Sequence, residues 1–328
     1  MPFRKRDAAP GGKKSTQLML FAASDLHGSE TCWRKFLNAG RQFDADVLLL
    51  NGDVAGKILV PFERRGSGYV CWFRGEQLAL ETGAELEAVS RTARQAGQYP
   101  YRAAGGEVEE LQERDYLEKV FRRVIRASVS EWLELAEEKL RGTPTRLLVM
   151  PGNDDPPDVA EVLAEAGVEN PEGQIVDVDD QHQMVALGYS NITPWHTPRE
   201  LSEPEIQARL ERDFAAVRDP ALTIGAIHCP PHDSGLDTAP VLDEHFKIQY
   251  DSGHVRMGPV GSTAVRAVLE RFQPLTSVHG HIHESAGVCK LGGTVAINPG
   301  SDYDEGVLRG VLVSISGARV RGHQFING

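Results

Sequence analysis

Short apolar runs and polar turns alternate along this chain, a pattern that predicts an α/β protein. Five apolar runs of strand length end directly in a polar residue, and they lie at 17–24, 46–50, 145–150, 222–227 and 275–278. After the first run, Trp33, Phe36 and Leu37 share one face of a predicted helix that begins near Ser29. Strands that alternate with helices in this way indicate a layered α/β fold.

The second half of the chain continues this alternation and then changes to strands alone. The elements predicted there are strands at 174–178 and 184–189 and helices from about Pro157, at 202–217 and at 262–272. From 287 to 325, short apolar segments are separated by Gly-Gly, Pro-Gly and Ser-Gly turns, which predicts a β-meander.

Residues from about 57 to 142 interrupt the alternation. They begin with a loop rich in Gly and Arg and continue with two charged segments of helical character, near 76–95 and 109–140. In the second segment, Leu117, Val120 and Phe121 recur at helical spacing, which is typical of a packing face. We therefore predict a helical insertion, which would be either a cap over the functional site or a dimer surface.

Composition and charge narrow the class of protein. The 328 residues are 41% hydrophobic and 25% charged, as in an ordinary soluble globular protein. The net charge of −12 opposes a broad nucleic-acid surface, because binding to phosphate backbones depends on clustered Lys and Arg. The four cysteines are scattered without a Cys-x-x-Cys pair, which indicates a reducing compartment with neither a disulfide framework nor a zinc–thiolate site.

The N-terminal residues 1–15 carry five Lys and Arg residues but lack the apolar stretch of a signal peptide. We expect a disordered basic tail here, and the alternative is an arm that binds nucleic acid or a membrane. Apolar runs elsewhere are too short for a transmembrane helix. A cytoplasmic protein is therefore expected.

Two histidines, His281 and His283, follow the last of the five apolar runs and are separated by one residue. At an extended strand end they would project to the same side, where two imidazole nitrogens can bind a transition metal. A lone His-x-His pair more often only forms hydrogen bonds in a buried turn, so a metal site requires partners elsewhere.

The other four apolar runs end in such partners, namely Asp25 with His27, then Asp53, Asn153 and His228. Because ligands collect at the carboxyl ends of strands in α/β sheets, we expect all seven side chains around one crevice. Their oxygen and imidazole donors suit Mn, Fe or Zn rather than a thiolate site or calcium. Seven ligands are too many for one ion and suit two, with Asp53, alone at its strand end, as the natural bridge.

With these residues in this order, the chain resembles the calcineurin-like metallophosphoesterase family, in its bacterial dinuclear form. The family signature is Asp-x-His, Gly-Asp, Gly-Asn-His-Asp/Glu, His and Gly-His-x-His. The chain matches it with Asp25-Leu26-His27, Gly52-Asp53, Gly152-Asn153-Asp154-Asp155, His228 and Gly280-His281-Ile282-His283. The turn Asn298-Pro299-Gly300-Ser301 is also similar to one common in bacterial members. The similarity extends from about residue 17 to residue 314 and excludes the insertion.

The resemblance implies an α/β fold of αββα type, in which two mixed β-sheets pack as a sandwich flanked by helices. It implies that Asp53 bridges two metals, the first held by Asp25, His27 and His283, and the second held by Asn153, His228 and His281. Two divalent ions are the expected cofactor, Mn²⁺ first, with Fe or Zn as alternatives. They would clamp the phosphoryl oxygens and lower the pKa of a bound water, which supplies hydroxide at neutral pH.

One residue departs from the family pattern, because Asp154 stands where the family usually has a histidine that protonates the leaving oxygen. An aspartate with an ordinary pKa of about 3.9 is ionised at pH 7 and is a poor general acid. Either the site raises the pKa of Asp154, or His232 or His254 donates the proton, or the leaving group needs none. The candidate catalytic residues are Asn153, Asp154 and His232. The candidate substrate-binding residues are Asn153, His232 and His254.

Other polar residues near these motifs have simpler explanations. His232 is as readily a surface loop residue. Lys57, just past Asp53, could place a cation near a phosphate, but a solvated lysine is the favoured interpretation. Packing of Trp195 is sufficient to explain the turn-rich segment that also contains His196.

The expected function is hydrolysis of a phosphomonoester or phosphodiester of a small molecule or nucleotide by metal-bound hydroxide. The alternatives are a non-catalytic protein-interaction scaffold of the same fold, a nuclease, which the acidic charge opposes, and a protein serine/threonine phosphatase, which the missing histidine opposes. The expected partner is a small phosphate ester, with no nucleic acid or membrane, and the insertion could mediate a homo-oligomer.

Overall fold

A computed structural model describes residues 17–243 and 245–328. The basic tail predicted at 1–15 lies outside the described residues. In the described ranges, no helix is both long and apolar enough to cross a membrane.

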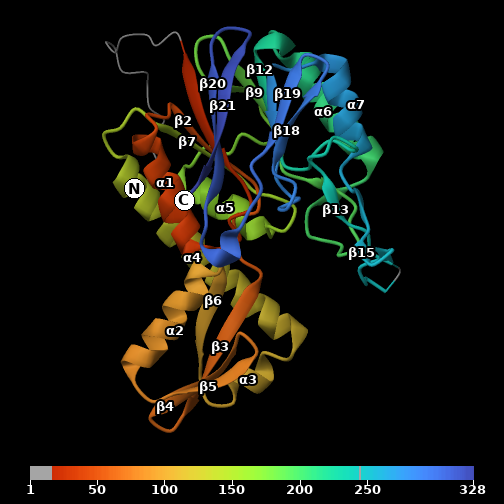
Figure 1. Ribbon diagram of the computed structural model, residues 1–328. Coiled ribbons are helices and arrows are strands. Elements are labelled where there is room, and N and C mark those ends of the chain that lie inside the picture. The colour runs from red at the N-terminus through yellow and green to blue at the C-terminus, as the bar shows by residue number, and fades with distance from the viewer. Residues whose placement is uncertain (1–16, 244) are drawn as a thin grey trace.

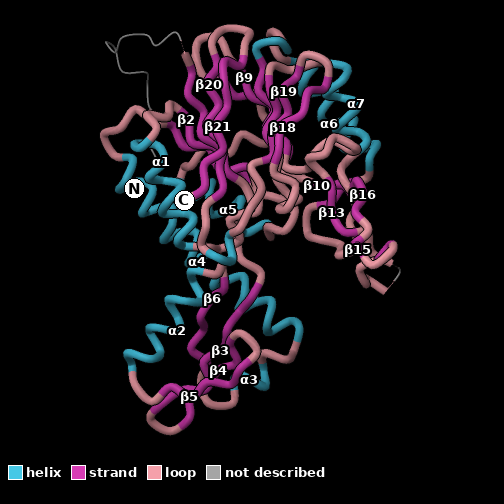
Figure 2. The backbone as a smooth tube through the Cα atoms, in the orientation of Figure 1, coloured by secondary structure: helices cyan, strands magenta, loops and turns pink. Residues whose placement is uncertain are grey.

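Two mixed β-sheets form the centre of the protein (Figures 1 and 2). The first has the strand order β21 (Val320–Asn327), β20 (Arg309–Ile315), β1 (Leu18–Ala23), β2 (Val47–Asn51), β7 (Arg146–Met150). The second has the order β18 (Gly287–Leu291), β19 (Thr294–Asn298), β17 (Thr276–Val278), β12 (Thr223–Ile227), β9 (Gln183–Leu187), β8 (Val176–Asp177). In each sheet the central strands are parallel. Antiparallel strands lie at one edge of the first sheet, opposite the parallel edge strand β7, and at both edges of the second.

Most central strands are rich in apolar residues, as the burial of both of their faces requires. On β1, Leu20 faces the second sheet, where it shares a core with Met184 and Ile224. The next residue, Phe21, points to the opposite face and packs among the helices. Each such side chain is completely buried and contributes about 1.5–3 kcal/mol relative to an exposed one.

Helices cover the outer face of each sheet. The first sheet is covered by α1 (Glu30–Gln42), α5 (Pro157–Ala166) and part of α4 (Arg114–Leu140). The second is covered by α6 (Glu203–Ala216) and α7 (Thr263–Phe272). The cap of α1 is Ser29, whose hydroxyl accepts a hydrogen bond from the N–H of Cys32. Helices and sheets therefore form the four αββα layers that the sequence predicted.

The insertion differs from the predicted helical unit. It forms a separate lobe, below the main body in Figure 1, around a sheet of order β5 (Glu76–Leu80), β4 (Gly68–Phe73), β3 (Ile58–Arg65), β6 (Gln98–Ala103). This sheet is accompanied by α2 (Gly83–Gln95) and the short α3 (Glu107–Glu110). The prediction of helical character over all of 76–95 was wrong. Residues 76–80 form the strand β5, which pairs with β4 and brings Leu78 and Leu80 to the core of the lobe.

Helix α4 joins the lobe to the main body. Its second half carries Val129, Trp132 and Leu133, which pack with the preceding Ile125 in the layer of α1 and α5. The indole N–H of Trp33 on α1 donates a hydrogen bond of 3.0 Å to the backbone carbonyl of Trp132. The predicted insertion therefore ended too late, since this half of α4 belongs to the sandwich.

The predicted β-meander at 287–325 is also wrong as a single unit. The hairpin of β18 and β19 extends the second sheet, whereas the hairpin of β20 and β21 extends the first. The turn η2 (Tyr303–Glu305) lies on the crossing between them. Turn residues in the sequence mark the hairpins, but they do not show which sheet each hairpin joins.

The loops at the edge of the second sheet contain the remaining short elements. These are β10 (Ser190–Asn191), β11 (Glu200–Leu201), η1 (Pro220–Leu222), β13 (Thr238–Pro240), β14 (Tyr250–Asp251), β15 (His254–Val255), β16 (Met257–Pro259). The last four form two ribbons in the long polar loop after β12, which projects below α6 and α7 in Figure 1.

Candidate metal centre

The polar strand ends predicted from the sequence meet at one edge of the sandwich, where backbone hydrogen bonds join their loops. The N–H of Asp25 donates to the carbonyl of Gly52, and the N–H of His27 donates to the carbonyl of Asp53. Across the second sheet, the N–H of Gly280 donates to the carbonyl of His228. These bonds fix the loops that carry the candidate ligands relative to one another.

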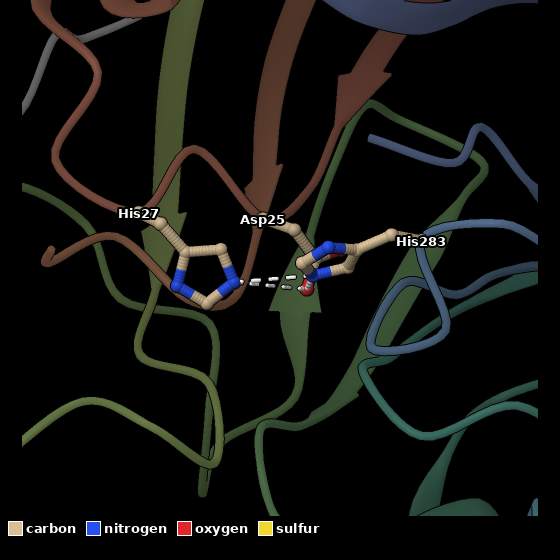
Figure 3. A group of neighbouring side chains, drawn as sticks. All are labelled: Asp25, His27 and His283. Carbon is tan, nitrogen blue, oxygen red and sulfur yellow. Dashed lines mark hydrogen bonds and ion pairs between the residues drawn. The ribbon is translucent and has the colours of Figure 1, made fainter. Parts of the chain in front are cut away.

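Asp25, His27 and His283 form a first group, in which one donor atom from each lies within 4.8 Å of the others. Figure 3 shows both imidazoles meeting at the carboxylate. The Nε2 atoms of His27 and His283 are 3.1 Å apart, and Nε2 of His283 is 3.4 Å from Oδ1 of Asp25. Two ring nitrogens and a carboxylate oxygen directed at one point are a suitable ligand set for a divalent transition metal.

Asp53, His228 and His281 form a second group within the same 4.8 Å limit. Asn153 joins it, because its Oδ1 lies 3.0 Å from Nε2 of His228. Its amide nitrogen donates to the hydroxyl of Thr197, which holds the amide oxygen toward the cluster. The structure thus brings together all seven predicted ligands.

Asp53 lies between the two groups. Its Oδ2 is 3.6 Å from Nε2 of His27 and 3.4 Å from Nε2 of His228. One carboxylate oxygen therefore faces both candidate metal positions, as a bridging ligand would.

The histidine pair differs from its predicted geometry. Strand β17 ends at Val278, so neither His281 nor His283 lies on an extended strand, and His281 has a φ of +66°. The turn directs His281 to the second group and His283 to the first.

Left-handed backbone is common at this centre. Asp25, His27 and Asp53 have φ values of +57°, +42° and +51°. Such conformations cost a residue other than glycine about 1–3 kcal/mol and cluster at functional sites. The surrounding bonds hold these loops in shape against that cost.

The charges in the cluster favour positive ions. Burial opposes ionisation of Asp53, but His228 holds its pKa well below the ordinary value. Burial alone would lower the pKa of His228, yet Asp53 and Asp25 raise it to about 9. Burial lowers the pKa of His27 to about 3 and that of His281 to about 4, so these rings are neutral and keep a lone pair for a metal.

Two further residues position the ligands. Nδ1 of His228 lies 2.7 Å from the carbonyl oxygen of Asn51, which leaves Nε2 free to face the cluster. The buried carboxylate of Asp155 accepts hydrogen bonds of 2.8–2.9 Å from the N–H groups of Val54, Ala55 and Gly152. Asp155 therefore ties the loop of Asp53 to the loop of Asn153. The family signature includes Asp155, but sequence reasoning gave it no role.

Asp154 lies at the mouth of the centre, where it forms an ion pair with Lys57 and a third possible ligand group with His27 and Asp53. Burial and the charge of Asp53 raise the pKa of Asp154 to about 6. The ring of Tyr303 lies 4.6 Å from that of His27. Sequence reasoning took Lys57 for a solvated side chain and missed Tyr303, because neither residue belongs to a motif.

The two other candidate donors, His232 and His254, belong to none of the three ligand groups found among the described residues. Nδ1 of His232 is 3.9 Å from Oδ2 of Asp237 in its own loop. His254 is exposed on the ribbon of β14 and β15. Trp195 does not pack as expected, since 66% of its side chain is exposed.

Comparisons with known proteins agree with this fold. No family model matches the chain. An uncharacterized protein of Methanocaldococcus jannaschii, MJ1162, is 29% identical over 155 residues, which is 47% of this chain and 63% of that protein. The chain thus spans less than two thirds of that relative's length.

Solved structures share the overall architecture. One crystal structure aligns with 95% of this chain and 98% of its own, with a TM-score of 0.57 and 14% identity. The crystal structure of the protein TT1561 of Thermus thermophilus aligns with 94% of this chain and 98% of its own, with a TM-score of 0.54 and 13% identity. At such identities the likeness shows the fold alone.

Two structures with named activities align more loosely. A novel archaeal phosphodiesterase and YfcE, a phosphoesterase from E. coli, have TM-scores of 0.37 and 0.31, too low to support an argument about this chain. The αββα fold and the ordered signature with its gathered Asp and His residues are consistent with a calcineurin-like metallophosphoesterase.

Proposed function

We propose that the protein is a dinuclear metal-dependent phosphoesterase that hydrolyses a small phosphate ester or a nucleotide. The observation that supports this most is that Oδ2 of Asp53 faces both His27 and His228, so two ligand groups share one carboxylate oxygen. Two divalent ions held there would supply Lewis-acid charge for the phosphoryl oxygens and an activated water. Mn²⁺ is the proposed metal, with Fe or Zn as alternatives, because the donors are oxygen and imidazole nitrogen.

The chain's own residues would order the site for this reaction. Asp155 and Asn51 hold the ligand loops, and Asn153 presents its amide oxygen to the second group. The acidic net charge of −12 favours a small substrate over a nucleic acid. The four free cysteines support a cytoplasmic location. We also propose that the lobe could mediate a homo-oligomer.

The test is metal analysis combined with hydrolysis of p-nitrophenyl phosphate and bis-p-nitrophenyl phosphate in the presence of added Mn²⁺. We expect up to two metal ions per chain and turnover that a chelator abolishes and Mn²⁺ restores. Absence of both bound metal and turnover would favour the scaffold alternative. Turnover of single- or double-stranded DNA but not of either small ester would favour the nuclease.

A further inference from the structure

Lys57 stands at the mouth of the metal centre, where the chain leaves the loop of Asp53 and enters the lobe. Its ammonium is paired with the carboxylate of Asp154, which itself lies near His27 and Asp53. The side chain of Lys57 is 47% exposed and that of Asp154 is 14% exposed. The ammonium is therefore on the solvent side of the carboxylate.

The ammonium can bind more than its present partner. A lysine ammonium has three donors, and Asp154 accepts from it through Oδ2. Burial would lower the pKa of Lys57, but Asp154 and Asp53 raise it, so the group is charged at neutral pH. A fixed positive charge with spare donors at the entrance can attract an anionic substrate.

Phosphomonoesters and phosphodiesters differ in their number of terminal phosphate oxygens, so a positive charge at the entrance can distinguish them. A phosphomonoester dianion has three terminal oxygens, whereas a phosphodiester monoanion has two. Two metal ions held by the ligand groups would offset charge on two of these oxygens, which would leave only the monoester with a third oxygen in need of a donor. Asn153 has one N–H donor left at most, because the other is bound to Thr197 and its oxygen faces His228, so Lys57 is the charged donor at this mouth.

We propose that Lys57 is a specificity residue that favours phosphomonoester dianions over phosphodiesters, an inference that rests on the proposed phosphoesterase function. The competing explanation is that Lys57 only neutralises Asp154. A double variant that lacks both Lys57 and the Asp154 carboxylate distinguishes these two roles. If Lys57 only neutralises Asp154, then removing that carboxylate as well should restore the activity lost with Lys57.

The experiment compares Lys57→Gln, Lys57→Arg, Asp154→Asn and the double variant Lys57→Gln/Asp154→Asn. The matched control is Lys290→Gln, at an exposed lysine on the edge strand β18. KM and kcat are measured with p-nitrophenyl phosphate and bis-p-nitrophenyl phosphate. Calorimetry measures Kd for inorganic phosphate and for dimethyl phosphate, so binding is read independently of turnover.

We expect Lys57→Gln to raise KM for the monoester and Kd for inorganic phosphate about tenfold, with less than about twofold change for the diester and dimethyl phosphate, as for loss of one charge-assisted hydrogen bond. Lys57→Arg should retain most of the preference, and adding Asp154→Asn should not restore it. Equal changes for mono- and diester, or full restoration in the double variant, would overturn the inference. Inactivity of the wild-type protein on both esters would instead contradict the proposed function.

Discussion

The N–H of Asp154 donates a hydrogen bond of 2.9 Å to Oδ1 of Asp53. This bond occupies the outer oxygen of the buried carboxylate and leaves Oδ2 directed at His27 and His228. The departure from the family signature at position 154 therefore does not disturb the bridge, because the backbone rather than the side chain makes this contact.

Replacing Asp53 with Asn tests the bridge. An amide offers one neutral oxygen in place of the carboxylate, so we expect loss of at least one metal ion per chain and a fall in kcat of roughly 100-fold or more. Metal content by mass spectrometry and turnover in saturating Mn²⁺ provide the two readouts. Asp251→Asn, on the exposed ribbon, is the control. Full metal content and activity in Asp53→Asn would refute the bridging role.

Asp155 is expected to matter for stability as well as for the site. Asp155→Ala leaves the N–H groups of Val54, Ala55 and Gly152 without their acceptor in a buried region. We expect the free energy of unfolding to fall by about 2–4 kcal/mol, since an unpaired buried donor costs about 1–3 kcal/mol and water can reach some of them. Urea unfolding of Asp155→Ala and of the unmodified protein measures this difference in the free energy of unfolding.

The control for that variant is Asp219→Ala, at a residue whose side chain accepts one hydrogen bond, from the N–H of Ala221 in η1. Losing this cap should cost about 1 kcal/mol. If Asp155→Ala destabilises the protein no more than Asp219→Ala does, then the three bonds do not hold the two loops together.

The sequence was sufficient to predict the sandwich and the meeting of the candidate ligands at one edge of it, for a physical reason. Central strands such as β2 are buried on both faces, so they appear as uninterrupted apolar runs, and their polar ends are easy to locate. Asp53 and Asn153 then lie at one edge of the first sheet, because parallel strands end on the same side of their sheet. His228 follows β12 of the second sheet, so its place beside them depends on how the two sheets pack.

The lobe and the mouth of the site could not be predicted in this way. The sequence of β5 consists of helix-forming residues, and only its pairing with β4 makes it a strand. Tyr303 reaches His27 because η2 follows the crossing between the two sheets, which no local pattern reveals. Lys57 pairs with Asp154, which lies far from it in the sequence, so no local pattern indicates the ion pair.

The stability of the metal-free protein should depend on the protonation of His228. Its pKa is raised to about 9 in the folded state, above the ordinary 6.5. A raised pKa stabilises the fold fully below pH 6.5, and the contribution is lost as pH rises from 6.5 through 9. We therefore expect the chelator-treated protein to be less stable toward urea at about pH 9.5 than at about pH 7.5, where the lowered pKa values of His27 and His281 contribute little.

Metal should reverse this trend. A metal ion competes with the proton on His228, so the stabilisation by added Mn²⁺ should grow as pH rises over the same window. His228→Asn should flatten the pH dependence of the metal-free protein. An unchanged pH dependence in His228→Asn would assign the effect to other groups.

The lobe should be coupled to the metal centre through Gly56. The N–H of Gly56 donates a hydrogen bond of 2.9 Å to the hydroxyl of Tyr99 in β6. A Cβ at Gly56 would overlap the carbonyl oxygen of Gly97 and lie 2.9 Å from that of His27. Gly56→Ala must therefore move either the lobe or the loop of His27, and such overpacking costs about 1–3 kcal/mol.

We expect Gly56→Ala to weaken Mn²⁺ binding and to lower the free energy of unfolding, which titration calorimetry and urea unfolding measure in turn. Gly83→Ala is the matched control, because a Cβ there meets open space at the start of α2. Tyr99→Phe separates the two contributions, since it removes the hydrogen bond without adding bulk. If Gly56→Ala binds Mn²⁺ as tightly as Gly83→Ala does, the lobe is attached to the sandwich without influencing the metal centre.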